Sequence, residues 1–262
     1  MKRYLKIYLS LLRINLIALF SYRANFINST ISSFIWGLFS VISILLLTSR
    51  TNSFFGWTRS EIIILAAVYS FLIGIFHMFF ARNFERFSRL IHNGQIDTVL
   101  LKPLDSQFSI SLWEFNYSSI SRIIMGAILL IYLLFSISYV PSVLNIILFF
   151  IFVFLGIMII YSLWMIASTF MIWVPQLTNI IDFMYSLNGL TKYPGEMYKR
   201  LSPVVFIFLL PLILVASSPF KILLNKANQF DVIPLFVISC SLLFFSRKFW
   251  ISALKSYTSA SN

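Results

Sequence analysis

The residues that could carry out chemistry in this chain are few and scattered along its 262 positions. Its two histidines, His77 and His92, are too few and too far apart to form a zinc site, and its single cysteine, Cys240, allows no intramolecular disulfide. The sequence contains no G-x-x-x-x-G-K-[ST] loop for the phosphates of ATP, no H-E-x-x-H, no G-x-S-x-G and no pair of carboxylates at helical spacing. It therefore predicts no catalytic, metal or cofactor site, and the energy for any work must come from a partner.

One group of polar side chains recurs at helical spacing inside an apolar run. Gln176, Asn179 and Asp182 follow Pro175 at every third position, which predicts a polar stripe along one membrane-spanning helix. Because polar groups are costly in lipid, such a stripe lines a translocation path or a dimer interface. The alternative is that these side chains form structural hydrogen bonds to neighbouring helices, and the residues alone do not separate the two interpretations.

The longest charged segment runs from Arg82 to Asp105, RNFERFSRLIHNGQIDTVLLKPLD. Its first half is basic and has a helical pattern, with Glu85 and Arg89 at i, i+4 spacing. Asn93-Gly94 is a strong turn dipeptide, and Pro103 ends the apolar stretch that follows it. A segment of this composition between long apolar runs lies in water or against a soluble partner.

The composition of the chain predicts a membrane protein. Hydrophobic residues make up 60% and charged residues 11%, and the mean hydropathy is +0.91, which is more apolar surface than a soluble domain can bury. The net charge of +12 would suggest nucleic acid in a soluble domain. In this chain it indicates loops beside anionic lipid headgroups, with no nucleic acid partner.

The apolar runs predict an all-α membrane protein with six spans, since crossing about 30 Å of hydrocarbon takes about 20 helical residues. Residues 142–187 contain no charge before Asp182 and are too long for one span, so we expect two spans joined by a tight turn near Ser162–Ser168. The predicted spans are 25–48, 61–81, 116–138, 142–163, 167–187 and 232–247. Residues 203–224 carry a proline at every eighth position, which favours a re-entrant hairpin of two short helices before the last span.

Residues 1–24 are amphipathic and are not a cleavable signal. A polar stripe occupies one helical face and leucines another, so we expect a helix that lies in the membrane interface. The alternative is an ordinary first span. The polar stripe consists of Lys2, Lys6, Ser10 and Arg13, and the apolar one of Leu5, Leu9, Leu12, Leu16 and Leu19.

The distribution of Lys and Arg predicts the orientation in the membrane. Six spans place both termini and the 82–115 loop on one side, with five Lys and Arg in residues 1–25, five in 82–122 and three at the C-terminus. The other side receives the remaining seven of the 20. The excess predicts that the loop and both termini are cytoplasmic in a multi-pass protein of the cell membrane.

Three motifs in this order resemble those of type-2 ATP-binding-cassette (ABC) exporter permeases. Ile91–Pro103, IHNGQIDTVLLKP, is similar to the family's cytoplasmic I-x-x-G-x-L-D-x-x-L-L-x-P motif, with Ile96 in place of the leucine. Pro203–Leu224 is similar to the re-entrant P…P…P…LL segment. The tail that begins at Phe249 looks like FW…GL-x-x-Y-x-S-A, with Ala253 in place of the glycine. The resemblance covers essentially the whole chain as a single permease domain, 1–262.

The resemblance implies a membrane half-transporter that pairs with a second permease, as a homodimer or a heterodimer, and with two separate ATPase subunits. ATP and Mg²⁺ would then be bound by those ATPases, with no cofactor on this chain. The loop 82–115 would carry the coupling helix that docks on the ATPase, with the main contacts expected from the basic helix before Gly94. The coupling residues implied are Arg82, Glu85, Arg86, Arg89, Gly94, Asp97 and Pro103.

Export of an amphiphile, a lipid-linked glycan or a hydrophobic peptide would suit the apolar, aromatic membrane domain. Two other classes stay open. A polytopic membrane enzyme that modifies lipids needs catalytic carboxylates or histidines gathered at a membrane face, whereas those of this chain are scattered singly. A channel or membrane scaffold should repeat pore-lining polar stripes, and the sequence shows a single one.

Overall fold

The computed structural model describes residues 2–49, 53–54, 56–177 and 179–257, which are almost entirely helical. A minimal antiparallel pair, β1 (Ser53–Phe54) with β2 (Trp57–Thr58), interrupts the helices. The helical elements are α1 (Lys2–Ser21), α2 (Arg23–Leu47), α3 (Arg59–Phe76), the π-helix η1 (His77–Ala81), α4 (Arg82–His92), α5 (Asp97–Leu100), α6 (Ser106–Ser111), the 3₁₀-helix η2 (Tyr117–Ser119), α7 (Ile120–Ser136), α8 (Val143–Phe170), α9 (Ile180–Leu190), α10 (Gly195–Leu201), α11 (Pro203–Leu223) and α12 (Gln229–Ser256).

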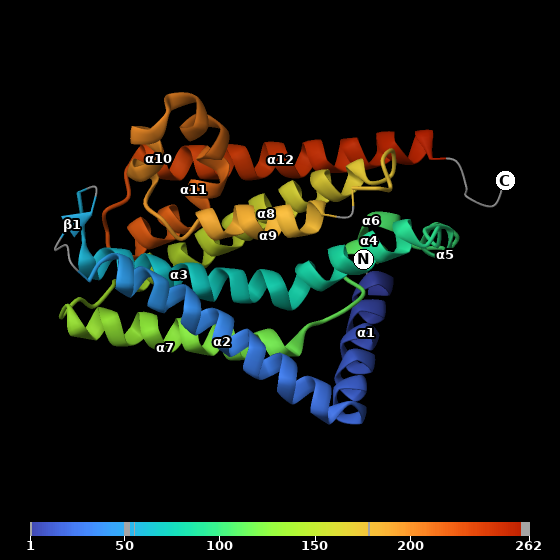
Figure 1. Cartoon of the computed structure of the whole chain (residues 1–262), viewed down its shortest axis with the longest axis horizontal. Helices are drawn as coiled ribbons and strands as arrows, with labels where there is room; N and C mark the ends of the chain where they lie inside the picture. The colour runs from blue at the N-terminus through green and yellow to red at the C-terminus, as the bar shows by residue number, and fades with distance from the viewer. Residues whose placement is uncertain (1, 50–52, 55, 178, 258–262) are drawn as a thin grey trace.

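The long helices run side by side between two ends of the molecule (Figure 1). We call the end with α4–α6, α1 and the last turns of α12 the basic end, and the end with β1–β2 and α10 the opposite end. Helix α1 lies across the direction of the bundle, as expected of a helix in the membrane interface (Figure 1). A hydrogen bond of 3.3 Å from Arg3 to the Pro103 carbonyl holds the start of α1 against the segment between α5 and α6.

Within the described residues, seven helices are long and apolar enough to cross a membrane, so the chain is an all-α, multi-pass membrane protein. The count differs from the six predicted spans. Helices α1 and α11 also meet the length and hydropathy criteria, and no helix of that length covers the predicted fifth span. The seven are Arg3–Ser21, Arg23–Leu47, Arg59–His92, Tyr117–Ser136, Val143–Phe170, Pro203–Leu223 and Asp231–Ser256.

The predicted break between the fourth and fifth spans is wrong. Helix α8 continues for 28 residues through the expected turn, and the fifth predicted span, 167–187, is reduced to the 11-residue α9. Two of the hydroxyls near the expected turn are satisfied within the helix, because Ser162 donates to the Met158 carbonyl at 2.7 Å and Thr169 donates to the Met165 carbonyl at 2.6 Å, whereas the buried Ser168 hydroxyl has no hydrogen-bond partner among the described residues. Packing against α11 and α12 buries this stretch and holds it helical.

Residues 203–224 do not form the two short helices that were predicted. They form the single helix α11, with Pro211 and Pro219 inside it. Proline at 219 leaves the Val215 carbonyl without its usual intrahelical N–H. A Cβ at Gly156 of α8 would lie 2.9 Å from that carbonyl oxygen, so glycine lets the two helices meet at backbone distance there.

The re-entrant course instead involves α10 and α11, which pack together. The Trp57 indole N–H donates to Glu196 at 2.8 Å, which places the start of α10 beside β2 at the opposite end. Lys226, just after α11, forms an ion pair with Glu61 of α3 at that same end. The chain therefore enters α10 and leaves α11 at one end, and α11 adds no passage between the ends.

The second span does not stop where the charged segment begins. Helix α3 passes through η1 into α4 as one helix of 34 residues, Arg59–His92. At 1.5 Å per residue it is about 50 Å long, about 20 Å more than the hydrocarbon of a bilayer. The first part of the predicted 82–115 loop is thus a rigid extension of the second span that projects at the basic end.

Candidate functional site

The projecting segment turns back where the sequence predicted. Gly94 has a φ of +65°, the left-handed conformation that ends a helix, and the Gln95 N–H donates to the Leu90 carbonyl at 2.7 Å. The chain then forms the short helices α5 and α6 and returns to α7 through the non-helical stretch Leu112–Asn116. We call α4, α5, α6 and this stretch the coupling unit.

Helix α4 is strongly two-sided. Phe84 and Phe87 are 0% and 1% exposed and pack into the hydrophobic core, with Ile91 one turn further along the same face. Arg82 and Arg89 point away from that face and are exposed. The apolar spacing therefore fixes which side of α4 packs against the bundle.

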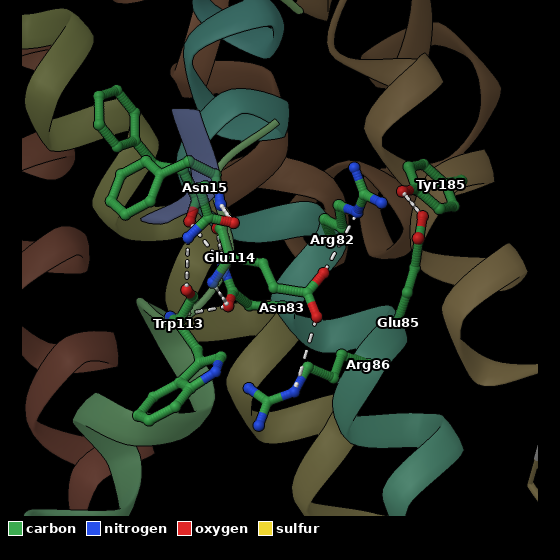
Figure 2. Close-up of polar contacts among 10 residues, drawn as sticks. Asn15, Arg82, Asn83, Glu85, Arg86, Trp113, Glu114 and Tyr185 are labelled. Atoms are coloured by element: carbon green, nitrogen blue, oxygen red, sulfur yellow. Dashed lines mark hydrogen bonds and ion pairs between the residues drawn. The ribbon is translucent and has the colours of Figure 1, made fainter. Parts of the chain in front are cut away.

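Asn83 holds the return stretch against α4 (Figure 2). Its side chain is 1% exposed, and its amide NH₂ donates to the carbonyls of Phe79 at 2.9 Å and Glu114 at 2.7 Å. Its amide oxygen accepts from the backbone N–H groups of Trp113 at 2.9 Å and Glu114 at 2.8 Å. One side chain thus satisfies three backbone groups in a stretch that has no helix or strand partner, and a fourth, the Phe79 carbonyl, in η1.

Asn15 of α1 binds the same stretch from the other side (Figure 2). Its NH₂ donates to the Trp113 carbonyl at 3.1 Å, and its oxygen accepts from the Phe115 N–H at 3.4 Å. The Tyr117 hydroxyl adds a bond of 3.0 Å to the Leu12 carbonyl. The coupling unit is therefore hydrogen-bonded to the crosswise helix as well as to the second span.

Charged and aromatic side chains also stabilise the contact between α4 and the return stretch. Glu114 pairs with the guanidinium of Arg82 at 3.2 Å and with that of Arg86 at 3.7 Å. The Lys102 ammonium lies 3.5 Å from the centre of the Trp113 ring, a cation–π contact. Burial and then the neighbouring charge of Arg86 lower the pKa of Lys102 below its usual value.

The π-helix joins the coupling unit to the span. A π-helical turn leaves a backbone carbonyl out of the regular i→i+4 pattern, and such turns are often found at functional sites. The Met78 carbonyl in η1 accepts a bond of 2.9 Å from the Asn116 N–H. The return stretch is thus attached to the junction at which α3 becomes α4.

The last membrane helix holds the remaining side of the coupling unit. Asp105 accepts two hydrogen bonds from Arg247 of α12, at 2.6 and 3.1 Å, and also caps α6 through the Phe108 N–H at 3.0 Å. The Trp250 indole donates to Ser106 at 3.1 Å. Burial acts to raise the pKa of Asp105, but the bonds from Arg247 and Phe108 outweigh it and hold the pKa below its usual value.

The structure gives the seven predicted coupling residues different surroundings. Arg82 and Arg86 face Glu114, within the coupling unit. Glu85 faces the bundle, where its carboxylate accepts a hydrogen bond from the Tyr185 hydroxyl of α9 (Figure 2). The other four lie at the outer surface of the unit: Arg89 is exposed near the end of α4, Gly94 forms the turn, Asp97 begins α5, and Pro103 offers its carbonyl to Arg3.

Of a surface at the tip of the coupling unit, the sequence interpretation included Arg89 alone. Leu101 is 85% exposed, and exposed polar side chains surround the turn on both sides. Leu101 is the single apolar member of this otherwise polar surface. The tip surface consists of Arg89, His92, Gln95, Thr98 and Leu101.

The predicted polar stripe Gln176, Asn179 and Asp182 does not form along one span. Gln176 lies in the turn after α8, Asn179 immediately precedes α9, and Asp182 is in the first turn of α9. All three are exposed at the basic end. The stripe failed because α9 begins only at Ile180, so helical spacing does not apply to the first two residues.

The functional residues that the sequence did not reveal are those with distant partners. Asn83 and Asn15 are isolated amides in helical patterns, and their partners are 31 and 98 positions away. Arg247 belonged only to a basic cluster at the end of the last span. The one signal in the sequence for Asn83 was its place beside Phe84 and one turn before Phe87. An amide that is buried with such residues needs hydrogen-bond partners.

Comparison with known proteins gives one finding. A family model described as "ABC-2 family transporter protein" matches residues 7–261. Searches of curated proteins and of solved structures give no match. The matched range includes the whole coupling unit and every long helix, apart from the first residues of α1.

Proposed function

The chain belongs to the ABC-2 transporter family, and from this membership we propose that it is the permease subunit of an ATP-driven exporter whose ATPase docks on the coupling unit. The observation that carries the proposal is the projection of α4 beyond the length of a membrane span, with its return stretch bonded to α4 and α1 and the start of α6 bonded to α12. The transported substrate would be an amphiphile, a lipid-linked glycan or a hydrophobic peptide.

A mechanical role suits the way in which the coupling unit is attached. Rigid-body movement passes through elements that are packed and hydrogen-bonded, whereas a flexible loop would absorb it. The Asn83 and Asn15 bonds tie the unit to the second span and to α1, and the Asp105–Arg247 pair ties it to the last span. A displacement of the tip by an ATPase would therefore move these three helices together.

The tip surface defined above is the proposed docking site. It lies on both sides of Gly94, so the contacts extend beyond the basic helix to which the sequence pointed. Leu101 would enter an apolar pocket on the ATPase, and Arg89 would pair with an acidic side chain at its edge. Glu85 would transmit movement to α9 through Tyr185 rather than touch the ATPase.

The remaining parts of the proposal follow from the family. A second permease, identical or different, and two ATPase subunits would complete the transporter, and ATP and Mg²⁺ would be bound on the ATPases. The basic end would face the cytoplasm of the cell membrane, with both termini there, because Lys and Arg are concentrated on that side.

Substitution of Leu101 tests the docking site. We expect Leu101→Glu to abolish co-purification with an ATPase encoded beside this gene and to abolish its stimulated ATP hydrolysis in vesicles. Val140→Glu is the matched control, because Val140 is 82% exposed in the turn between α7 and α8 at the opposite end. Undiminished association of the Leu101 variant, or equal loss in the Val140 variant, would remove the support for this docking site.

A further inference from the structure

Two adjoining cavities lie beside the coupling unit, where α6, α8 and α12 meet at the basic end. Their volumes are about 370 and 460 Å³, within the range of small-molecule sites. Three polar side chains, which we call the polar row, line both cavities: Gln107, Tyr161 and Arg247. The other side chains of the larger cavity belong to α12 and are apolar. A few fixed polar groups in an apolar cavity are typical of a site for a small amphiphilic ligand.

A chain of hydrogen bonds fixes the polar row. The Arg247 guanidinium donates to the Gln107 amide oxygen at 2.9 Å, and the Gln107 NH₂ donates to the Tyr161 hydroxyl at 2.9 Å. The Tyr161 hydroxyl also lies 2.9 Å from the Ser111 hydroxyl. Gln107 and Tyr161 are each 8% exposed, although both line the cavities. The protein therefore sets their positions before any ligand binds.

The polar row keeps hydrogen-bonding capacity that the protein does not use. A guanidinium has five N–H donors, and within the described part of the chain Arg247 makes three hydrogen bonds, two to Asp105 and one to Gln107. The Tyr161 hydroxyl has one donor and two acceptor positions and takes part in two bonds. Asp105 neutralises Arg247 at 2.6 Å. The site thus offers hydrogen bonds without net charge, which suits hydroxyl groups better than a phosphate or an ammonium group.

Helix α12 gives the larger cavity a direction. Its lining residues lie on one helical face, because they are spaced at i, i+3, i+4 and i+7: Cys240, Leu243, Phe244 and Arg247. At 1.5 Å per residue, Arg247 lies about 27 Å from the start of α12, and Cys240 lies about 10 Å nearer to that start. Since the hydrocarbon layer is about 30 Å thick, the polar row lies near its boundary at the basic end and the apolar residues lie within it. The cavity has the same order of polar and apolar parts as a lipid of that leaflet.

The apolar part of the cavity opens outward. Phe244 is 63% and Leu243 39% exposed, and Cys240 is exposed as well. Such side chains in a membrane-spanning helix contact the surrounding hydrocarbon. A lipid chain can therefore enter the cavity from the bilayer without any movement of the helices.

We propose that these cavities bind a lipid of the leaflet at the basic end, with an uncharged, hydroxyl-bearing head group on the polar row and a hydrocarbon chain along Cys240 and Phe244. The head group accepts hydrogen bonds from Arg247 and forms one with Tyr161. Because Arg247 also holds Asp105, the bound lipid lies against the residue that ties the coupling unit to the last span. This binding site goes beyond the proposed transport function and does not require an ATPase.

Photo-crosslinking in vesicles tests the site. The probe is glucosyl diacylglycerol with a diazirine in one acyl chain, mixed at low mole fraction into phosphatidylcholine vesicles that contain the purified chain. We expect crosslinks to residues 240–244 of α12. Tyr161→Phe should lower their yield about threefold or more, because a hydrogen bond to the head group is lost. Tyr132→Phe, the same change at a tyrosine of α7 that is 67% exposed, should leave the yield unchanged.

Filling the cavity gives a second test that leaves the polar row intact. Leu243→Trp should abolish the crosslinks, because the larger side chain occupies the space of the hydrocarbon chain. Ile207→Trp is the matched control, since Ile207 is 69% exposed on α11 and lines neither cavity. Undiminished crosslinking in Leu243→Trp would overturn the site, and so would equal losses in the two tryptophan variants.

Competition with unlabelled lipids tests the head group. Glucosyl diacylglycerol should displace the probe, whereas equal amounts of phosphatidic acid or of a trimethylammonium lipid with the same chains should displace much less of it. Equal displacement by all three would show that only the chain is bound and would overturn the head-group assignment. Absence of crosslinks at residues 240–244 in the wild type, as expected if a second permease covers this face, would overturn the site. Loss of ATPase docking would refute the proposed function and leave this lipid site standing.

Discussion

Asn83 offers the sharpest test of how the coupling unit is held. Replacement by alanine removes four hydrogen bonds at a side chain that is 1% exposed. It leaves the N–H groups of Trp113 and Glu114 without this partner, and each unsatisfied buried group costs about 1–3 kcal/mol. Partial relaxation and entry of water reduce the sum, so we expect the return stretch to be destabilised by about 3 kcal/mol. Since 1.4 kcal/mol is a factor of ten, this predicts a loss of about 100-fold in local protection.

Amide hydrogen exchange measures this quantity directly, because it reports the opening free energy of individual segments. In Asn83→Ala, the amides of residues 113–115 should exchange about 100-fold faster than in the wild type, while those in the middle of α8 should not change. Asn28→Ala is the matched control, because Asn28 is an exposed asparagine on α2. Unaltered exchange at residues 113–115 in Asn83→Ala would refute the idea that this side chain holds the stretch.

Two further predictions concern packing and pH. A Cβ at Gly126 of α7 would lie 2.7 Å from the backbone nitrogen of Phe71, so Gly126→Ala should cost about 1–3 kcal/mol and lower the thermal stability of the purified chain. Gly189→Ala, with open space around it, should not lower it, and equal effects would contradict this account. The pKa of Asp105 is held below its usual value of 3.8, so its contribution to stability is present above that pH and is lost as the pH falls through the lower, folded-state pKa. The protection of the Phe108 amide, corrected for the intrinsic exchange rate at each pH, should therefore fall as the pH drops below 3.8 in the wild type. It should fall less in Arg247→Gln, because the bonds that lower the pKa of Asp105 are lost; identical profiles would argue against the pairing.

The membrane class and the positions of several long helices could be predicted because they depend on local composition. A run of about 20 apolar residues must be helical in lipid whatever its neighbours are, since its backbone groups have no water to bind. This holds for α2, α3 and α7, which occupy the predicted ranges 25–48, 61–81 and 116–138 with shifts at their ends. The turn at Gly94 is local in the same sense, because glycine adopts a positive φ at little cost.

The errors concern residues whose local preference was overridden by packing. The length of the apolar run 142–187 suggested two spans joined by a turn near Ser162–Ser168, but α8 continues through it, and Ser162 satisfies its hydroxyl within the helix and is buried against neighbouring helices. Prolines suggested a break in 203–224. The carbonyl left without its intrahelical N–H by Pro219 instead packs directly against the backbone of α8 at Gly156, and the helix continues. Neither outcome can be predicted without knowing which helix lies alongside.

The coupling unit also combines features that follow from the local sequence with features that only the tertiary structure decides. Its charge, its turn and its resemblance to a family motif all lie within Arg82–Asp105 and were visible as a pattern of residues. The hydrogen bonds that attach it to the other helices were not visible. Asn83 and Asn15 bind backbone groups 31 and 98 positions away, and Arg247 binds Asp105, which is 142 positions away. The direction in which Glu85 points was equally hidden, because it depends on where α9 places Tyr185. Local chemistry therefore decides that a charged helix projects from this membrane protein, and contacts between distant segments decide what that helix can move.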